Sequence, residues 1–128
     1  MTADLLTRDL ACIQAALSAV RMPARPEEYD IHARIAEALS AAGLSYIHEY
    51  RLGPRCRIDF RVGRVGIEVK KGRPSRAALT AQLCRYLTFS ELDAVVVVAQ
   101  RVTRLPGLIC GKPVVTVSLN RLWGVALP

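Results

Sequence analysis

The chain has 128 residues, 52% of them hydrophobic, and a formal net charge of +7. This length predicts one domain with a single core, and no apolar run reaches the roughly 18 residues that a membrane span requires. The N-terminal stretch carries acidic residues early and lacks a basic lead into an apolar block, which excludes a typical signal peptide. We therefore expect a soluble, cytoplasmic protein with no membrane partner.

The start of the chain predicts a helix that stands apart from the later motifs. Apolar residues at three- and four-residue spacing indicate a helix over residues 3–21, and a linker containing Pro23 and Pro26 follows it. We treat residues 1–26 as an N-terminal helix and linker ahead of a domain at residues 27–128. The helix either packs on the back of that domain or supplies a dimer contact.

A second helix is predicted over Glu27–Ala42, ending at Gly43, which suits the C′ position. At about 100° per residue, Glu28 falls within the apolar stripe of this helix, whereas Glu37 falls on the opposite side. Glu28 is therefore the acid expected to face inward, with Glu27 next by phase. The alternative is that Glu28 is only a first-turn acid favoured by the helix dipole.

A strand is predicted over Ser45–Leu52, followed by a turn at Gly53-Pro54. His48 and Glu49 belong to this strand and could approach a site on its neighbour, but the sequence assigns neither a role. His32, on the same flank of the second helix as Glu28, is expected to be a surface or packing residue.

The stretch RIDFRVGRVGIEVKK, residues 57–71, predicts a hairpin. Apolar and polar residues alternate on both sides of Gly63 and Arg64, which is typical of half-buried strands. Gly63-Arg64 suits a two-residue turn of type II′. That turn would pair Val62 with Val65, Phe60 with Ile67, Asp59 with Glu68, and Arg57 with Lys70.

This register places two carboxylates, Asp59 and Glu68, opposite each other with Lys70 on the same face. Like charges in such positions are destabilising unless something neutralises them. Mg²⁺ takes oxygen ligands from one or two carboxylates, and an ammonium beside the metal helps to stabilise phosphoryl-transfer charge. The alternative is a solvated strand face neutralised by Arg57 and Lys70.

A third helix is predicted over Arg76–Phe89, with Ser75 as its N-cap. Gln82 and Tyr86 stand at positions i and i+4 and should share one face. The alternative for this pair is a tyrosine at the edge of the core beside a neighbouring amide. The residues expected to be buried are Leu79, Leu83, Tyr86 and Leu87.

The last third of the chain predicts two strands. The uninterrupted apolar run Ala94–Ala99 indicates a strand covered on both faces, as in a parallel pair after a crossover helix. Gln100–Pro113 is expected to be a loop, and Val114–Leu119 a final strand. Trp123, in the tail, is expected to be a packing anchor rather than a base-stacking platform.

Charge and cysteine usage add two expectations. Residues 51–85 hold ten basic side chains and two acidic ones, the footprint of a polyanion such as nucleic acid, with a solubility surface as the alternative. The four cysteines include no CxxC pair, so we expect reduced, mostly buried thiols rather than structural zinc. They are Cys12, Cys56, Cys84 and Cys110.

Asp59, followed after eight intervening residues by Glu68-Val69-Lys70, resembles the D…(D/E)xK core of the PD-(D/E)XK nuclease superfamily. Ile58 stands where the strict form has proline. The Gln82-xxx-Tyr86 pair resembles the helix motif of the RecB-like branch. Over residues 28–119 the resemblance implies an α/β fold with a restriction-endonuclease-like αβββαβ core and a mixed β-sheet, to which the N-terminal helix is an addition.

The resemblance implies a Mg²⁺-dependent deoxyribonuclease in which Mn²⁺ can substitute. Asp59 and Glu68, with the Val69 carbonyl, would hold the metal, and Glu28 would complete the metal shell. Lys70 would assist the attacking water and stabilise the transition state.

The same resemblance implies that Gln82 and Tyr86 fix the substrate strand or the surroundings of Lys70. DNA is the expected substrate, with RNA left open, in a repair or recombination role. Basic residues near the site are expected to contact phosphates: Arg57, Arg61, Lys71, Arg73, Arg76 and Arg85.

Two further hypotheses compete with the nuclease. One is a catalytically inactive nuclease-fold module that binds nucleic acid or a protein partner. The other is a subunit that requires a helicase or recombination partner, since a chain of this length has no separate specificity domain. A homodimer would suit cleavage of both strands of a duplex. The sequence leaves open endo- or exonuclease action, substrate structure and the number of metals.

Overall fold

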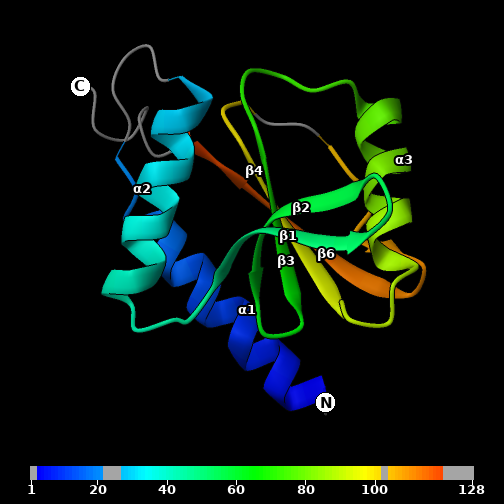
Figure 1. Cartoon of the computed structure of the whole chain (residues 1–128), viewed down its shortest axis with the longest axis horizontal. Coiled ribbons are helices and arrows are strands. Elements are labelled where there is room, and N and C mark those ends of the chain that lie inside the picture. The colour runs from blue at the N-terminus through cyan, green and yellow to red at the C-terminus, as the bar shows by residue number, and fades with distance from the viewer. Residues whose placement is uncertain (1–2, 22–26, 102–103, 120–128) are drawn as a thin grey trace.

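A computed structural model describes residues 3–21, 27–101 and 104–119 of the chain (Figure 1). Three helices and six strands lie within these residues, in the order that the sequence predicts except for one added short strand. The elements are α1 (Ala3–Ser18), α2 (Glu28–Ala41), β1 (Ile47–Gly53), β2 (Cys56–Val62), β3 (Val65–Lys70), α3 (Arg76–Leu87), β4 (Ala94–Ala99), β5 (Leu108–Ile109) and β6 (Lys112–Ser118).

The strands form one mixed sheet in the order β1-β2-β3-β4-β6-β5. β1, β2 and β3 are antiparallel neighbours, whereas β3, β4 and β6 run parallel. β4 pairs in parallel with β3 after the crossover through α3, and all six of its residues are buried, as its apolar run predicts. β5 was not predicted: it is antiparallel to β6, in a segment expected to be a loop.

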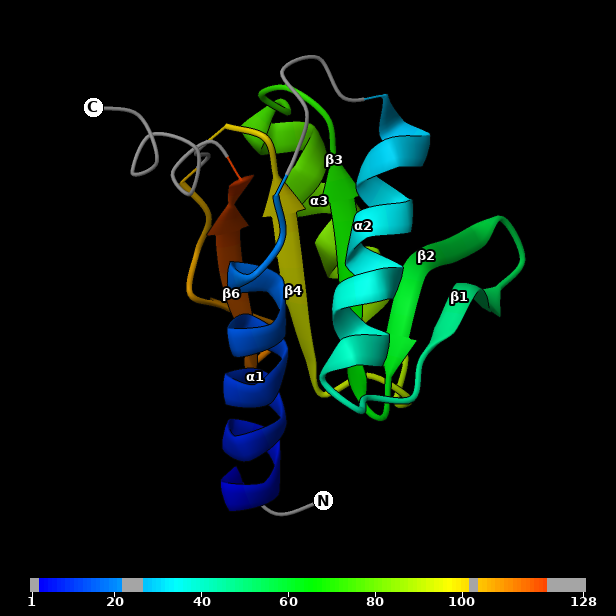
Figure 2. The same cartoon turned by 90° about the vertical axis from the view of Figure 1, so that its left-hand side faces the viewer.

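Helices cover both faces of the sheet, as Figure 2 shows. α1 and α2 pack on one face through residues such as Leu17 and Ile35, which share a buried cluster with Phe60. α3 packs on the opposite face through Leu83 and its neighbours. The chain is therefore an α/β protein with a mixed sheet between two helical layers. All four α3 residues expected to be buried are buried: Leu79, Leu83, Tyr86 and Leu87.

The predicted helix ends are confirmed at two positions. Ser75 caps α3, since its hydroxyl oxygen accepts a hydrogen bond from the Ala78 backbone nitrogen at 3.3 Å. Gly43 follows the end of α2 with φ of +75°, the left-handed conformation that a C′ glycine adopts readily. These two caps fix where α3 begins after β3 and where α2 leads into β1.

The hairpin register is confirmed near the turn and wrong beyond it. Gly63 has φ of +58°, and Val62 pairs with Val65 and Phe60 with Ile67. The β2–β3 ladder ends there, so the expected pairs of Asp59 with Glu68 and of Arg57 with Lys70 do not form.

The cause is a change of face in β2. Ile58 belongs to the cluster under α3, whereas Phe60 belongs to the cluster under α1 and α2. Regular alternation would put these two residues on the same face. The strand therefore turns over at Asp59, and the carboxylate of Asp59 accepts a hydrogen bond from the Val69 backbone nitrogen at 2.7 Å.

The expectation of mostly buried cysteines is wrong. Cys12, Cys84 and Cys110 are exposed, and only Cys56 is half-buried. Cys12 and Cys84 lie on the solvent-facing sides of α1 and α3, and Cys110 lies in the exposed turn before β6. None of these three positions faces the core. In the described part of the chain, no helix has the length and apolar character needed to cross a membrane. Trp123 and the linker prolines Pro23 and Pro26 lie outside the described residues.

Candidate active site

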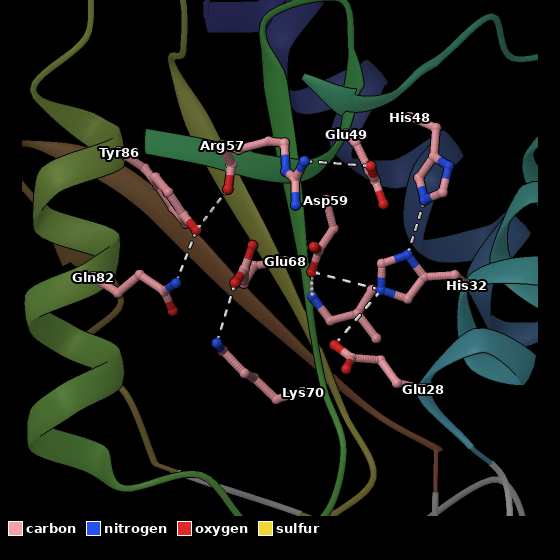
Figure 3. A network of polar contacts seen from close by, with 11 residues as sticks. Glu28, His32, His48, Glu49, Arg57, Asp59, Glu68, Lys70, Gln82 and Tyr86 are labelled. Atoms are coloured by element: carbon pink, nitrogen blue, oxygen red, sulfur yellow. Dashed lines mark hydrogen bonds and ion pairs between the residues drawn. The ribbon is translucent and has the colours of Figure 1, made fainter. Parts of the chain in front are cut away.

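The chemistry-bearing side chains predicted from the sequence gather where β2 and β3 separate (Figure 3). Asp59 comes from β2, and Glu68 and Lys70 come from β3. In Figure 3 these three residues lie between α3, which carries Gln82 and Tyr86, and α2. The site therefore lies at the end of the β2–β3 ladder, where side chains from both α2 and α3 can contact the residues of the two strands.

Glu68 is the most buried acid of the site. It is 3% exposed, its Oε2 lies 3.2 Å from Lys70 Nζ, and its Oε1 finds no hydrogen-bond partner within residues 3–21, 27–101 and 104–119. Burial and the nearby charge of Asp59 raise the pKa of Glu68 to about 7, although Lys70 and the Tyr86 hydroxyl act in the opposite direction. Burial dominates because it removes water from the ionised carboxylate. The ion pair with Lys70 offsets this cost only in part.

Asp59 lies across the gap from Glu68 and is oriented by two groups. Its Oδ2 accepts the Val69 backbone hydrogen bond and lies 3.9 Å from His32 Nε2. The Asp59 side chain is 22% exposed, so it stays in contact with solvent. The two carboxylates are brought together as predicted. They meet where the two strands separate, however, and not as a cross-strand pair.

α3 contributes a hydrogen-bonded pair at the other side of Glu68. Gln82 Nε2 donates to the Tyr86 hydroxyl at 2.9 Å, which confirms the shared face, and the Tyr86 hydroxyl donates to the Arg57 carbonyl oxygen at 3.1 Å. Burial and the charge of Glu68 raise the pKa of Tyr86. Tyr86 therefore remains a neutral donor that ties α3 to β2 beside Glu68.

α2 contributes a histidine whose place in the site the sequence did not indicate. Glu28 is exposed, but its Oε1 lies 3.9 Å from His32 Nε2, which is itself 3.9 Å from Asp59. His32 Nε2 is buried and has no hydrogen-bond partner in the part of the chain that the structure describes, and Nδ1 of the same ring lies 2.9 Å from His48 Nε2. The i, i+4 spacing of Glu28 and His32 was the available signal, whereas the contact with His48 joins two elements that the sequence could not place together.

Glu49 is a further acid beside the site (Figure 3). It has φ of +56°, and its carboxylate lies 3.5 Å from Arg57. A non-glycine residue in this conformation costs roughly 1–3 kcal/mol, and such strain concentrates at functional sites. Glu49 lies in β1 opposite Asp59, the residue at which β2 changes face.

The basic residues expected to contact phosphates are distributed unevenly. Arg57 and Lys71 are exposed and pair with Glu49 and Glu27, and Arg73 and Arg76 are exposed near the start of α3. Arg61 instead lies over the Tyr50 ring and pairs with Glu91 at 3.3 Å. Arg85 lines a surface hollow of about 530 Å³ together with Lys70, Ser75 and Gln82.

The donor set suits a hard divalent cation, although no ready-made cage is present. The described ranges contain no group of three or more His, Cys, Asp or Glu side chains that could hold a metal ion. Two observations favour a cation between Asp59 and Glu68: no described residue hydrogen-bonds the buried Glu68 Oε1, and the charge of Asp59 raises the pKa of Glu68. Mg²⁺ uses one or two carboxylates and otherwise keeps water, so these residues fit it. The next polar groups on the α2 side are His32, whose Nε2 lies 3.9 Å from Asp59 Oδ2, and Glu28, whose Oε1 lies 3.9 Å from His32 Nε2.

Comparison with protein-family models, with curated proteins and with solved structures gives no match.

Proposed function

We propose that this protein is a metal-dependent nuclease that hydrolyses phosphodiester bonds in DNA. The observation that carries the proposal is the gathering of Asp59, Glu68 and Lys70 at the end of the β2–β3 ladder, where Glu68 Oε1 is buried and has no hydrogen-bond partner among the described residues. A buried acceptor without a partner is costly unless a donor or ion completes it. A divalent cation shared with Asp59 would complete it.

In this proposal Asp59 and Glu68 hold Mg²⁺ or Mn²⁺, with the Val69 carbonyl, Glu28 and His32 as further candidates. The bound metal would lower the pKa of water and offset charge on the phosphoryl group. The orientation of the Asp59 carboxylate is fixed, because its Oδ2 accepts a hydrogen bond from the Val69 backbone nitrogen. This would leave its remaining lone pairs for the metal.

Lys70 is proposed to act on the substrate side. Its side chain is 29% exposed, and Lys70 lines the hollow that Gln82 and Arg85 also line. From that position Lys70 can orient the attacking water and stabilise negative charge on the transferred phosphoryl group. Gln82 and Tyr86 would position the strand, and Arg85 and the exposed arginines at the start of α3 would contact its phosphates.

The arrangement of elements supports the proposal. α2, β1, β2, β3, α3 and β4 follow the αβββαβ order of the PD-(D/E)XK core, and β1–β4 lie in sequence order in a mixed sheet. The acid-bearing strands β2 and β3 occupy adjacent positions there. A restriction-endonuclease-like core is thus the specific fold that we infer, with α1 as an addition.

A second candidate is a catalytically inactive module that binds nucleic acid or a protein. Its support is that Lys70 neutralises Glu68 directly at 3.2 Å, so the site is partly balanced without a metal. In that case the basic surface would bind polyanions and the carboxylates would have only a structural role.

The proposal is tested by a cleavage assay on single-stranded, duplex and branched DNA, in the presence of Mg²⁺, Mn²⁺ or EDTA. Asp59→Asn and Lys70→Ala should abolish metal-dependent cleavage. Arg8→Ala is the control, because Arg8 is an exposed basic residue on α1 that belongs to neither the site nor the expected phosphate contacts, and it should retain cleavage. DNA binding that is independent of metal, without cleavage, would support the inactive module instead. Absence of both binding and cleavage would point to a required partner such as a helicase or recombination subunit.

A further inference from the structure

Two cysteine thiols meet on the α3 side of the sheet, away from the carboxylates. Cys84 Sγ on α3 lies 3.7 Å from Cys110 Sγ in the turn between β5 and β6, although the two residues are 26 positions apart. Both cysteines are exposed, so a small reagent in solution can reach both sulfurs. This contact carries an inference that does not depend on the nuclease proposal.

Packed neighbours hold both sulfurs in place. Leu83, beside Cys84, and Ile109, beside Cys110, belong to the same buried cluster. The start of β6 is also tied to the connection between α3 and β4, because Lys112 Nζ donates to the Phe89 carbonyl oxygen at 3.2 Å and to the Leu92 carbonyl oxygen at 2.6 Å. The backbone segments that carry the two thiols are therefore held next to each other by buried neighbours and by Lys112.

The backbone at Cys110 is unusual for a cysteine. Cys110 has φ of +55° and Gly111 has φ of +70°, the pattern of a two-residue type I′ turn. Asparagine, aspartate or glycine is preferred at the first of these positions, because other side chains are strained there. Strain of this kind concentrates at functional positions. The strained backbone of Cys110 therefore suggests a functional role for its thiol.

We propose that Cys84 and Cys110 form a reversible intramolecular disulfide, with a low-molecular-weight disulfide of the glutathione class as the oxidant. In the first step the thiolate of one cysteine attacks a sulfur of the oxidant, a mixed disulfide forms, and one glutathione thiolate leaves. In the second step the other cysteine thiolate attacks the protein sulfur of that mixed disulfide and displaces the second glutathione. The two cysteines lose two electrons and two protons, and the oxidant becomes two thiols.

The bond would join α3 covalently to the β5–β6 turn. Cys84 lies between Gln82 and Tyr86 on α3, so the cross-link would fix the helix that carries this pair. Closing the bond requires only a small approach of the two sulfurs from 3.7 Å to the disulfide length of about 2.05 Å. The segment between the two cysteines contains the whole of β4, and closing a loop of this kind restricts the unfolded chain.

The test incubates the folded full chain with a series of oxidised-to-reduced glutathione ratios, followed by alkylation of free thiols and peptide mass mapping. We expect a Cys84–Cys110 cross-linked peptide and a monomer lighter by two hydrogens. Cys84→Ser or Cys110→Ser should abolish the cross-link and leave a glutathione adduct on the remaining cysteine. Cys12→Ser is the control, because Cys12 is an exposed cysteine on α1, and it should leave the cross-link intact.

Proximity predicts a second readout. The concentration of oxidised glutathione that half-forms the cross-link should be at least about tenfold lower than the concentration that half-modifies Cys12, because the second step is intramolecular. The oxidised wild-type chain should also unfold at a higher temperature than the reduced chain, with no such difference in Cys84→Ser. Separate glutathione adducts on both cysteines without a cross-link, or a bond between two chains, would overturn the proposal.

Discussion

The Asp59 carboxylate accepts a hydrogen bond from the Val69 backbone nitrogen at 2.7 Å, at the point where the β2–β3 ladder ends. The side chain of one strand thus takes a backbone donor of the other strand that no longer has a ladder partner. This keeps β2 and β3 close enough for the charges of Asp59 and Glu68 to interact, while leaving room between them.

The first prediction concerns the coupling of the two carboxylates. Asp59→Asn should lower the pKa of Glu68 below its value of about 7, because the amide oxygen can keep the Val69 hydrogen bond while the like charge is removed. The pKa should stay above the ordinary value, since burial is the larger cause. Carbon-13 NMR titration of the Glu68 carboxyl in EDTA measures it. Glu37→Gln, an exposed change on α2, is the control. An unchanged Glu68 pKa in Asp59→Asn would show that the carboxylates do not interact.

The second prediction concerns stability and pH in the absence of metal. The pKa of Glu68 is about 7 in the folded chain and 4.5 ordinarily. Below about pH 4.5 the carboxyl is protonated in both states and costs nothing. As pH rises from there to about 7, the unfolded chain loses the proton first, so the wild type loses stability, and the loss is complete above pH 7. Glu68→Gln should escape this loss, which amounts to at most about 3 kcal/mol.

Urea unfolding at pH 4, 5.5 and 8 in EDTA measures the difference between Glu68→Gln and wild type. The free energy of unfolding of the variant should gain on that of wild type as pH rises across this range. A difference that is constant with pH would mean that Glu68 titrates normally in the folded chain.

The third prediction concerns His32. Because its buried Nε2 lies 3.9 Å from the carboxylates of both Asp59 and Glu28, His32→Gln should weaken Mn²⁺ binding at least about tenfold. His48→Phe keeps an aromatic ring stacked on Phe60 and removes only the contact with His32 Nδ1, so it should weaken binding less. Isothermal titration calorimetry compares the three proteins. Wild-type affinity in His32→Gln would remove His32 from the metal site.

The fourth prediction concerns the packing that allows β2 to turn over. A Cβ on Gly66 would lie 2.3 Å from Ile58 Cδ1 and 3.1 Å from Leu92 Cδ1, and Ile58 is fully buried. Gly66→Ala should therefore destabilise the chain by about 1–3 kcal/mol through overpacking. Gly107→Ala, where a Cβ meets nothing within 4 Å, should be nearly neutral. Thermal unfolding of both variants measures this, and equal stabilities would contradict the assigned packing.

Much of the fold could be predicted because it is encoded in local periodicity. The apolar run of β4, the helical spacing in α2 and α3, and the cap at Ser75 each depend on residues close in sequence. The hairpin register near Gly63 was also local, since turn length fixes it. The same rule failed at Asp59, because ladder continuation assumes regular alternation and the two strands follow different helical layers beyond Phe60.

The site was predictable in its residue types and less so in its contacts. Asp59, Glu68 and Lys70 were identified from spacing, and the Gln82–Tyr86 contact from helical geometry. The contact between His32 and His48 joins α2 to β1, and no periodicity in either segment indicates it. Cys84 and Cys110 meet for the same tertiary reason, with the crossover to β4 between them. β5 was missed because a two-residue strand leaves no pattern.

The proposed nuclease requires a divalent cation in the gap between Asp59 and Glu68. Substoichiometric Mn²⁺ added to nitrogen-15-labelled protein tests it directly, because the paramagnetic ion broadens amide signals near its site and no DNA substrate is needed. Selective broadening of the amide signals of Asp59, Val69 and Lys70, lost in Asp59→Asn and Glu68→Gln, is the expected result. Broadening that is absent, located elsewhere or unchanged in both variants would contradict the metal site and with it the proposed nuclease.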